Sequence, residues 1–269
     1  MYPGETGGSC VTRVRLDKLL LERGLAETLD TARALIMAGQ VVVGNHMIDK
    51  AGRMVTAEDD VRLKSGQHQY VSRGGIKLQK ALNEFCVDVA GLVAVDVGAS
   101  TGGFTDCLLQ AGAAKVFAID VGYGQLAWKL RQDPRVVIME RTNIRHVTRE
   151  QFDEEPELAV IDASFISLGK VLPVVAGLLP RGGRIIALIK PQFEVGRHEA
   201  VAGGVIHDSA IHDKVIDDIR RTSFDMGLSV VGLCESPITG ADGNREFLIL
   251  LQVPVTPGER GQDGGVHFL

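Results

Sequence analysis

Two lysines and two carboxylates, widely separated in the sequence, could together take the proton from a hydroxyl group. They are Lys77, Asp162, Lys190 and Glu246. A hydroxyl group is a poor nucleophile while it keeps its proton, and a lysine can act as base when burial and a second cation disfavour its charged form. The carboxylates would orient the lysines and offset their charge, and this chemistry needs no metal ion. A structural ion-pair network is the alternative for the same residues.

The predicted strand ends place these four residues on one edge of a sheet. Asp162 follows one strand, Lys190 follows the next and precedes Pro191, and Glu246 begins the last strand. Lys77 lies near the start of the helix that leads into the first strand. Open α/β sheets bind ligands at the carboxyl ends of their parallel strands. The last strand runs in the opposite direction, so its beginning shares that edge.

The sheet is predicted from an alternation of strands and helices that begins after residue 72. Helices are expected near 75–85, 102–111, 123–132, 167–179 and 208–226. They separate strands at Val93–Val97, Lys115–Ile119, Val136–Met139, Leu158–Ile161, Arg184–Ile189, Leu228–Cys234 and Glu246–Leu251. This alternation predicts a mostly parallel sheet with helices on both faces. The last connection is too short for a crossover helix, so the last strand is antiparallel. The fold class is α/β and resembles the Rossmann-like sheet of class I methyltransferases.

A glycine-rich loop after the first strand is the strongest local signal. The segment Asp96–Phe104 reads Asp-Val-Gly-Ala-Ser-Thr-Gly-Gly-Phe. Glycines let the backbone approach a ligand closely, and the helix start adds unpaired N–H donors. Ser100 occupies the place of the second glycine in a dinucleotide site, which disfavours that site. A serine hydrolase elbow matches Gly98–Gly102 literally, with an aspartate and His207 or His212 following in the required order.

A nucleoside site explains two acids that the hydrolase hypothesis does not explain. Asp96 ends the first strand, and Asp120 ends the second. Asp120 comes 24 residues later, near the spacing of about 20 residues expected for an acid that holds ribose hydroxyls. This pattern favours a methyltransferase, and simple capping of strand ends is the remaining alternative. The residues expected to bind its cofactor are Asp96, Gly98, Ser100, Gly102, Phe104, Asp120, Val121 and Asn143.

A smaller unit is predicted at residues 13–65, before a polar linker at 66–72 and the α/β domain at 73–253. Within it we expect a helix near 16–23 that ends at Gly24 and a helix near 30–38 that ends at Gly39. A hairpin near 41–48 and a last strand near 61–63 follow. The segment 1–12 is expected to be disordered, and 254–269 to be a flexible tail.

Charge and composition restrict the partners. The net charge is −5, but residues 13–80 hold 12 Lys and Arg against 8 Asp and Glu, an excess of +4 that fits either RNA binding or a solvated surface. No apolar run reaches the roughly 18–20 residues that span a bilayer, so no membrane partner is expected.

The four cysteines lack C-x-x-C spacing. This argues against a zinc site and against a disulfide framework, and it fits a protein of the reducing cytoplasm. Cys86, Cys107 and Cys234 are expected to be buried thiols.

The small unit resembles the S4 RNA-binding domain. The resemblance rests on Arg15-Leu16-Asp17, on Thr31–Ile36 and on Ala38–Val43. The hairpin departs from the usual pattern at 44–47, where the sequence is Gly-Asn-His-Met. The resemblance implies RNA contacts from Arg15 and Arg33. A generic helix and hairpin unit is the alternative.

Residues Arg13–Gln252 resemble the TlyA family of ribosomal RNA 2′-O-methyltransferases. The α/β domain is also similar to FtsJ-type methyltransferases. The resemblance places their Lys-Asp-Lys-Glu tetrad on Lys77, Asp162, Lys190 and Glu246 and implies that Lys190 is the base. The motifs that carry the resemblance are Ser72–Leu78, Asp96–Asp106, Asp120–Leu126, Asp162–Leu168, Lys190–Glu194 and Gly243–Phe247.

This resemblance implies methyl transfer from S-adenosylmethionine to a ribose 2′-hydroxyl, of cytidine, in ribosomal RNA. The expected partners are ribosomal RNA or ribosomal subunits, and Arg73 is expected to contact RNA as well. A noncatalytic RNA-binding protein of the same fold is the second hypothesis, against which the intact tetrad and cofactor positions speak.

Overall fold

The computed structural model separates the chain into two compact units, Met1–Gln67 and His68–Leu269. The boundary falls within the segment 66–72 that was predicted to be a linker. The structure describes residues 13–26, 28–37, 39–44, 46–63, 69–195, 205–240 and 243–255. The predictions for the segment 1–12 and for the tail beyond residue 255 lie outside these described residues.

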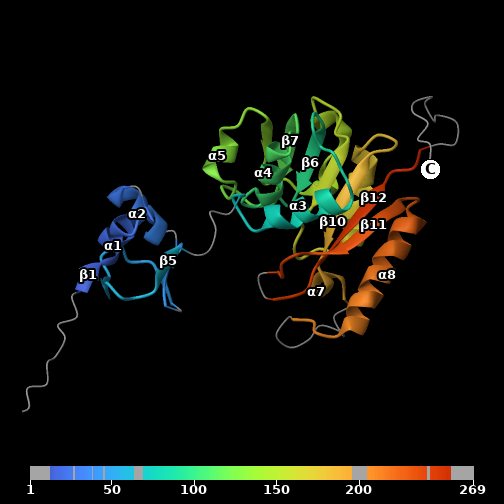
Figure 1. The fold of residues 1–269 in the computed structure, drawn as a ribbon. Helices are drawn as coiled ribbons and strands as arrows, with labels where there is room; N and C mark the ends of the chain where they lie inside the picture. The colour runs from blue at the N-terminus through green and yellow to red at the C-terminus, as the bar shows by residue number, and fades with distance from the viewer. Residues whose placement is uncertain are drawn as a thin grey trace, which may run out of the picture. The chain divides into compact units, whose positions relative to one another are not determined.

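The described residues of the N-terminal unit form two short helices and five short strands (Figure 1). The helices α1 and α2, the hairpin β2–β3 and the strand β5 are the predicted elements, and β5 pairs with β2. An additional pair of strands, β1 and β4, was not predicted. In chain order the elements are β1 (Arg13–Arg15), α1 (Leu16–Glu22), α2 (Leu29–Met37), β2 (Val41–Val43), β3 (His46–Ile48), β4 (Met54–Thr56) and β5 (Val61–Leu63).

The core of this unit explains why such short elements are stable together. Leu16 and Leu20 of α1 and Ala32 and Ile36 of α2 are fully buried, and they pack with Val41 of β2. Apolar side chains at spacings of three and four residues face one side of a helix, so each helix presents one buried stripe to the strands.

The second unit is built on a seven-stranded sheet with the order β11-β12-β10-β9-β6-β7-β8. β12 is antiparallel to both of its neighbours, and the other pairs are parallel, as predicted. The strands are β6 (Val93–Val97), β7 (Lys115–Ile119), β8 (Val136–Met139), β9 (Leu158–Ile161), β10 (Arg184–Ile189), β11 (Ser229–Glu235) and β12 (Phe247–Gln252).

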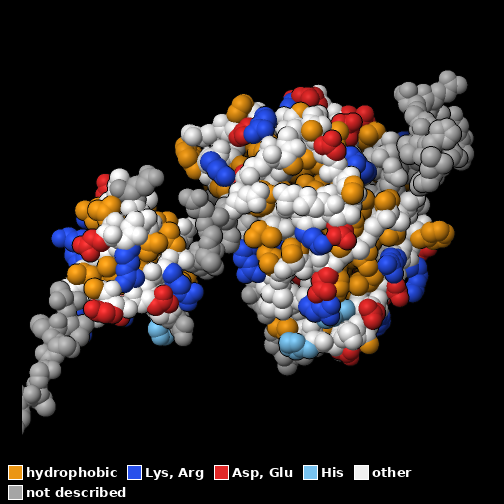
Figure 2. Space-filling model, in the orientation of Figure 1, with side chains coloured by type: hydrophobic (Ala, Val, Ile, Leu, Met, Phe, Trp, Pro, Cys, Tyr) orange, Lys and Arg blue, Asp and Glu red, His pale blue; other side chains and the backbone are white. Residues whose placement is uncertain are grey.

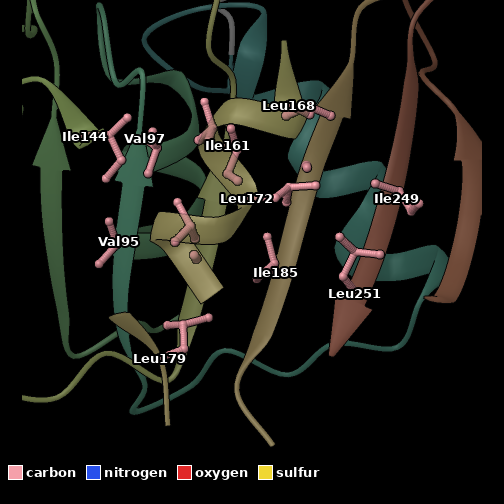
Figure 3. Close-up of a cluster of buried hydrophobic side chains, with 14 of the residues drawn as sticks. Val95, Val97, Ile144, Ile161, Leu168, Leu172, Leu179, Ile185, Ile249 and Leu251 are labelled. Atoms are coloured by element: carbon pink, nitrogen blue, oxygen red, sulfur yellow. The ribbon is translucent and has the colours of Figure 1, made fainter. Parts of the chain in front are cut away.

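Helices cover both faces of this sheet (Figure 1). One face packs against α3 (Gly74–Glu84) and α4 (Gly103–Gln110), and the other packs against α6 (Leu168–Leu178) and α8 (Ser209–Asp225). Figure 3 shows Val95, Val97 and Ile161 on the α6 side, near Leu172. Strand neighbours such as Ala94 point to the opposite face, because side chains alternate along a strand. Burial of both faces requires the nearly continuous apolar strands that the sequence contains.

The predictions for one helix and for two cysteines of this unit need correction, and one short helix was not predicted. The helix expected at 123–132 is limited to α5 (Trp128–Arg131), because the preceding loop turns at Gly124, whose φ is +71°. A short helix, α7 (Pro191–Glu194), follows β10 and was not predicted. Cys86 was expected to be buried but is exposed, whereas Cys107 is buried and Cys234 is half-buried. In the described part of the chain, no helix is long and apolar enough to cross a membrane.

Candidate active site

The site lies where the strand order of the sheet reverses, between β6 and β9. The chain passes from β6 to β7 and β8 on one side, and from β9 to β10 on the other. Ligands bind at such switch points because the two loops diverge and leave a crevice. Gly98 follows β6 with a φ of +84°, and a Cβ there would lie 2.7 Å from the carbonyl oxygen of Asp162. Only glycine lets these two strand ends come so close.

A cavity of about 410 Å³ opens beside the end of β7, and we call it the β7 cavity. It has apolar walls and a few polar groups, as small-molecule sites commonly do. The predicted residues Gly98, Ser100, Asp120, Val121 and Asn143 line it. Its other lining residues are Val97, Ile119, Gln125, Thr142, Ile144, Arg145, Asp162, Ala163, Ser164, Phe165 and Ile166.

Asp120 is fixed in this cavity by the backbone of two loops. One carboxylate oxygen accepts the N–H of Ser100 at 2.8 Å, and the other accepts the N–H of Gly122 at 2.6 Å. Each carboxylate oxygen has a further lone pair, so both can still accept from a ligand. The φ of Ser100 is +49°, in the left-handed region, which aims its N–H at the carboxylate.

Three predicted cofactor residues, Asp96, Gly102 and Phe104, do not line the β7 cavity. Phe104 is 3% exposed and lines an adjoining pocket instead. Asp96 is fully buried beneath the loop, where it accepts a 2.6 Å hydrogen bond from the hydroxyl of Thr105. Burial raises the pKa of Asp96 to about 7. Gly102 has a φ of +95° and faces Leu126 and Leu130, so it serves the turn into α4. Asp96 and Gly102 shape the loop from behind.

The serine hydrolase hypothesis fails on the partners of Ser100. Its hydroxyl lies 3.3 Å from the amide oxygen of Gln125. His212 is 1% exposed and its Nε2 bonds to the carbonyl of Ile206, while His207 is exposed. No histidine lines the β7 cavity or the two other described pockets that contain Ser100. A nucleophilic serine needs a base within hydrogen-bond reach, so Ser100 is a backbone element of the cavity.

A second pocket, of about 180 Å³, adjoins the β7 cavity, and we call it the lysine pocket. Lys190 follows β10 and lies beside Asp162, with 2.6 Å between Nζ and Oδ1. Its Nζ also donates to the hydroxyl of Ser164 at 2.8 Å. The lysine pocket is lined by Ser72, Gly74, Lys77, Gly98, Ala99, Ser100, Thr101, Gly103, Phe104, Asp162, Ser164 and Lys190.

Lys77 and Glu246 form a second, more deeply buried pair. Lys77 projects from α3, and its Nζ lies 2.5 Å from Oε2 of Glu246. Glu246 is 3% exposed and does not line the lysine pocket. The four residues predicted to meet thus lie at one sheet edge, where they form two ion pairs. Three of them, Lys77, Asp162 and Lys190, face the lysine pocket.

The predicted RNA-contacting arginines lie in different surroundings. Arg15 and Arg33 both bind the carboxylate of Asp17, at 2.7 and 3.3 Å, and these contacts lower the pKa of Asp17 to about 2. Each side chain remains about half exposed, at 45% and 48%. Arg73 is exposed and donates to the carbonyl of Thr239. Figure 2 shows basic side chains interspersed with acidic ones on the visible face of the N-terminal unit.

Ser164 is a polar residue of the site that was not among the predicted site residues. It lines both the β7 cavity and the lysine pocket and bonds to Lys190. Its position two residues after Asp162, on the same strand-end loop, was the available signal. Among the described residues, no cluster of His, Cys, Asp and Glu could hold a metal ion.

Comparison with known proteins shows the family to which the chain belongs. The FtsJ-like methyltransferase family matches residues 70–253, and the S4 domain family matches residues 14–61. The 16S/23S rRNA (cytidine-2′-O)-methyltransferase TlyA of Mycobacterium tuberculosis is 42% identical over 258 residues, covering 95% of this chain and 96% of that protein. Hemolysin A of Brachyspira hyodysenteriae is 40% identical over 236 residues, covering 87% of this chain and 98% of that protein.

Solved structures extend the similarity to the fold. A structure from Streptococcus thermophilus that carries the name hemolysin has a TM-score of 0.71 and 45% identity, covering 92% of this chain and 91% of that chain. A methyltransferase structure from Listeria monocytogenes has a TM-score of 0.51 and 15% identity, covering 68% of this chain and 100% of that chain. At that identity, the second match supports only the fold.

Proposed function

The chain belongs to the FtsJ-like methyltransferase family and has an S4 domain at its N-terminus, and on that premise we propose that it methylates the 2′-hydroxyl group of a cytidine in ribosomal RNA. S-adenosylmethionine is the methyl donor of this family. The TlyA protein of Mycobacterium tuberculosis is named for this reaction and is similar over almost the whole of both chains. The observation that carries the proposal is the position of Lys190, in the pocket that adjoins the β7 cavity.

The β7 cavity has the size and the groups that S-adenosylmethionine requires. Its volume of about 410 Å³ lies within the roughly 300–1,000 Å³ of typical ligand sites. Asp120 can accept hydrogen bonds from the two ribose hydroxyls of the donor, and Ile144 and Ile166 offer apolar walls for a base. Bound S-adenosylmethionine supplies a methyl group made electrophilic by its sulfonium.

Lys190 is the general base of the proposed reaction. Its Nζ faces the lysine pocket, in which a ribose of the RNA would lie beside the β7 cavity. As the methyl group moves to the 2′-oxygen, the hydroxyl proton passes to the neutral amine of Lys190. Positioned general bases of this kind contribute roughly 10²–10⁴-fold to a rate.

The other three members of the tetrad position Lys190 and the ribose. Asp162 forms an ion pair with Nζ of Lys190 and balances the positive charge that Lys190 gains with the proton. Lys77 reaches the same pocket and can orient the ribose through an N–H donor. Glu246 acts through Lys77, because it is buried behind that lysine and does not face the pocket.

The S4 domain supplies affinity for RNA in this proposal through Arg15 and Arg33, and Arg73 of the methyltransferase domain is a third candidate phosphate contact. Exposed guanidinium groups attract phosphates and release counterions, so binding should weaken steeply as salt rises. The RNA is presented in ribosomal subunits, in the cytoplasm. Binding of subunits measured across a salt series would reveal this electrostatic part of the affinity.

A methyl-transfer assay tests the proposed function. The full chain is incubated with tritiated S-adenosylmethionine and either ribosomal subunits or free ribosomal RNA, and the modified nucleotide is then mapped. We expect incorporation into a cytidine ribose, and almost none with Lys190→Ala. RNA binding without any incorporation would instead support the noncatalytic hypothesis, and a label on a base would place the chemistry elsewhere on the nucleotide.

A further inference from the structure

We infer that Ser164 is a positioning residue that directs the lone pair of Lys190 toward the ribose hydroxyl. The inference rests on the proposed function and concerns the same site. It starts from the hydrogen bond that Nζ of Lys190 donates to the Ser164 hydroxyl, at 2.8 Å. Nζ also lies 2.6 Å from Oδ1 of Asp162, two residues earlier on the same loop, in an ion pair that lacks hydrogen-bond geometry.

The geometry of a lysine amine gives these two partners a specific consequence. The neutral amine has two N–H bonds and one lone pair. Ser164 accepts one N–H in this structure, and Oδ1 of Asp162, which accepts no hydrogen bond here, lies within reach of the second. When both oxygens accept an N–H, the lone pair is the group left for a ligand in the pocket. With Asp162 alone, the amine could rotate about its Cε–Nζ bond and present an N–H to the ribose hydroxyl. Ser164 therefore selects the orientation in which Lys190 can accept a proton.

The loop that carries Ser164 is held against the segment that carries Lys190. The rings of Phe165 and Phe193 are in contact, with 5.0 Å between their centroids. Glu194 accepts hydrogen bonds from the Ser167 hydroxyl at 2.6 Å and from the backbone N–H of Leu168 at 2.8 Å. These contacts join the loop after β9 to α7, on which Lys190 is the residue before the first turn. The distance between Ser164 and Lys190 is therefore set from both sides.

The position of Ser164 leaves room for conservative substitutions. The residue is exposed and lies in a loop, so neither a helix nor the sheet depends on its side chain. Threonine keeps the hydroxyl and adds a methyl group, whereas valine has nearly the shape of threonine without the hydroxyl. The pair Ser164→Thr and Ser164→Val thus isolates the hydroxyl from the volume of the side chain.

Single-turnover methylation of ribosomal subunits tests the inference, with calorimetric Kd for S-adenosylmethionine measured on the same proteins. We expect Ser164→Ala and Ser164→Val to be about tenfold to a hundredfold slower, since a small misplacement of a catalytic group costs up to about a hundredfold. Ser164→Thr should recover most of the rate. The rates are compared at saturating donor, because Ser164 also lines the β7 cavity. Ser229→Ala, at an exposed serine of β11, is the matched control and should change neither quantity.

The outcomes separate this inference from the proposed function. A wild-type chain that does not methylate subunits would overturn both. If the wild type methylates and Ser164→Ala does so equally fast, the inference alone is wrong. It is also wrong if threonine and valine at this position give the same rate, because the hydroxyl then has no role. A loss of donor affinity that accounts for the slower rate would make Ser164 a cofactor contact instead.

Discussion

Two lysines face the same pocket but have different partners. Lys190 pairs with Asp162, whose side chain is 23% exposed, and with the hydroxyl of Ser164. Lys77 pairs with Glu246, whose side chain is 3% exposed. A buried carboxylate that loses its cation destabilises the protein strongly, so Lys77 is bound to its role as counter-ion. Asp162, in contrast, still has contact with water. In the proposed reaction, this difference in the burial of the partner carboxylate distinguishes the base Lys190 from Lys77, which stays paired while it orients the ribose.

Removing Lys190 should give the largest loss of activity and so tests the difference between the two lysines most directly. Lys190→Ala should lower the single-turnover methylation rate by roughly 10²–10⁴-fold while donor and RNA binding persist. Lys190→Arg should fail almost as badly, because a guanidinium does not give up its proton in proteins. The rate is measured against pH for the wild type and both variants. An arginine variant of near-normal rate would mean that Lys190 supplies only charge.

Removing Lys77 should affect stability more than the chemical step. Lys77→Ala leaves Glu246 buried without its cation, a change that typically costs about 3–5 kcal/mol of unfolding free energy. Urea unfolding measures this cost. Lys80→Ala, on the same helix, breaks the more exposed pair with Glu84 and is the matched control, which should unfold nearly like the wild type. Equal stability of the two variants would contradict the distinction between the lysines.

Removing Asp120 should affect the binding of the cofactor and not the chemical step, which separates it from the removal of Lys190. Asp120→Ala should weaken binding of S-adenosylmethionine at least about tenfold, since hydrogen bonds to a charged group contribute roughly 1.5–3 kcal/mol each. Calorimetry measures the Kd. At saturating donor, the methylation rate should return toward that of the wild type, whereas Lys190→Ala should stay slow. Unchanged affinity would place the ribose of the donor elsewhere.

The smallest expected effect concerns Asp96, a buried carboxyl bonded to a hydroxyl and not to a lysine. Burial raises its pKa from an ordinary value of 3.8 to about 7. The folded protein thus holds this proton more tightly than the unfolded chain, and the stability it contributes is lost as the pH rises through about 7. Asp96→Asn should therefore stabilise the protein, relative to the wild type, more at alkaline than at mildly acidic pH. Urea midpoints across this range measure it, and a pH-independent difference would contradict the buried ionisation.

The elements of the sheet were predictable because each strand is an apolar run between clear turns. The first five strands have the predicted bounds, and the two helices of the N-terminal unit end where Gly24 and Gly39 were expected to end them. The weaker elements were not predictable. The pair β1–β4 was not predicted, and the segment before α5, which turns at Gly124, was predicted to be helix.

The residues of the candidate site were predictable where they follow the end of a strand. The contacts between their side chains were not predictable. Asp120, Lys190 and Asp162 were selected because each closes a strand at one sheet edge. Asp96 also closes a strand, but it points beneath the loop and not into the cavity. Alternation along β6 decides this, since a side chain can face either layer of helices and the sequence does not mark which layer holds the ligand.

The sequence by itself determined the order of elements, the antiparallel last strand and the edge at which the four charged residues meet, because these follow from local periodicity and connection length. Only the tertiary structure decided that the four residues form two separate pairs, that Glu246 is hidden behind Lys77, and that Ser164 joins Lys190. These contacts bring together residues far apart in the chain. Their distances and exposure depend on how the loops pack, which no local pattern encodes.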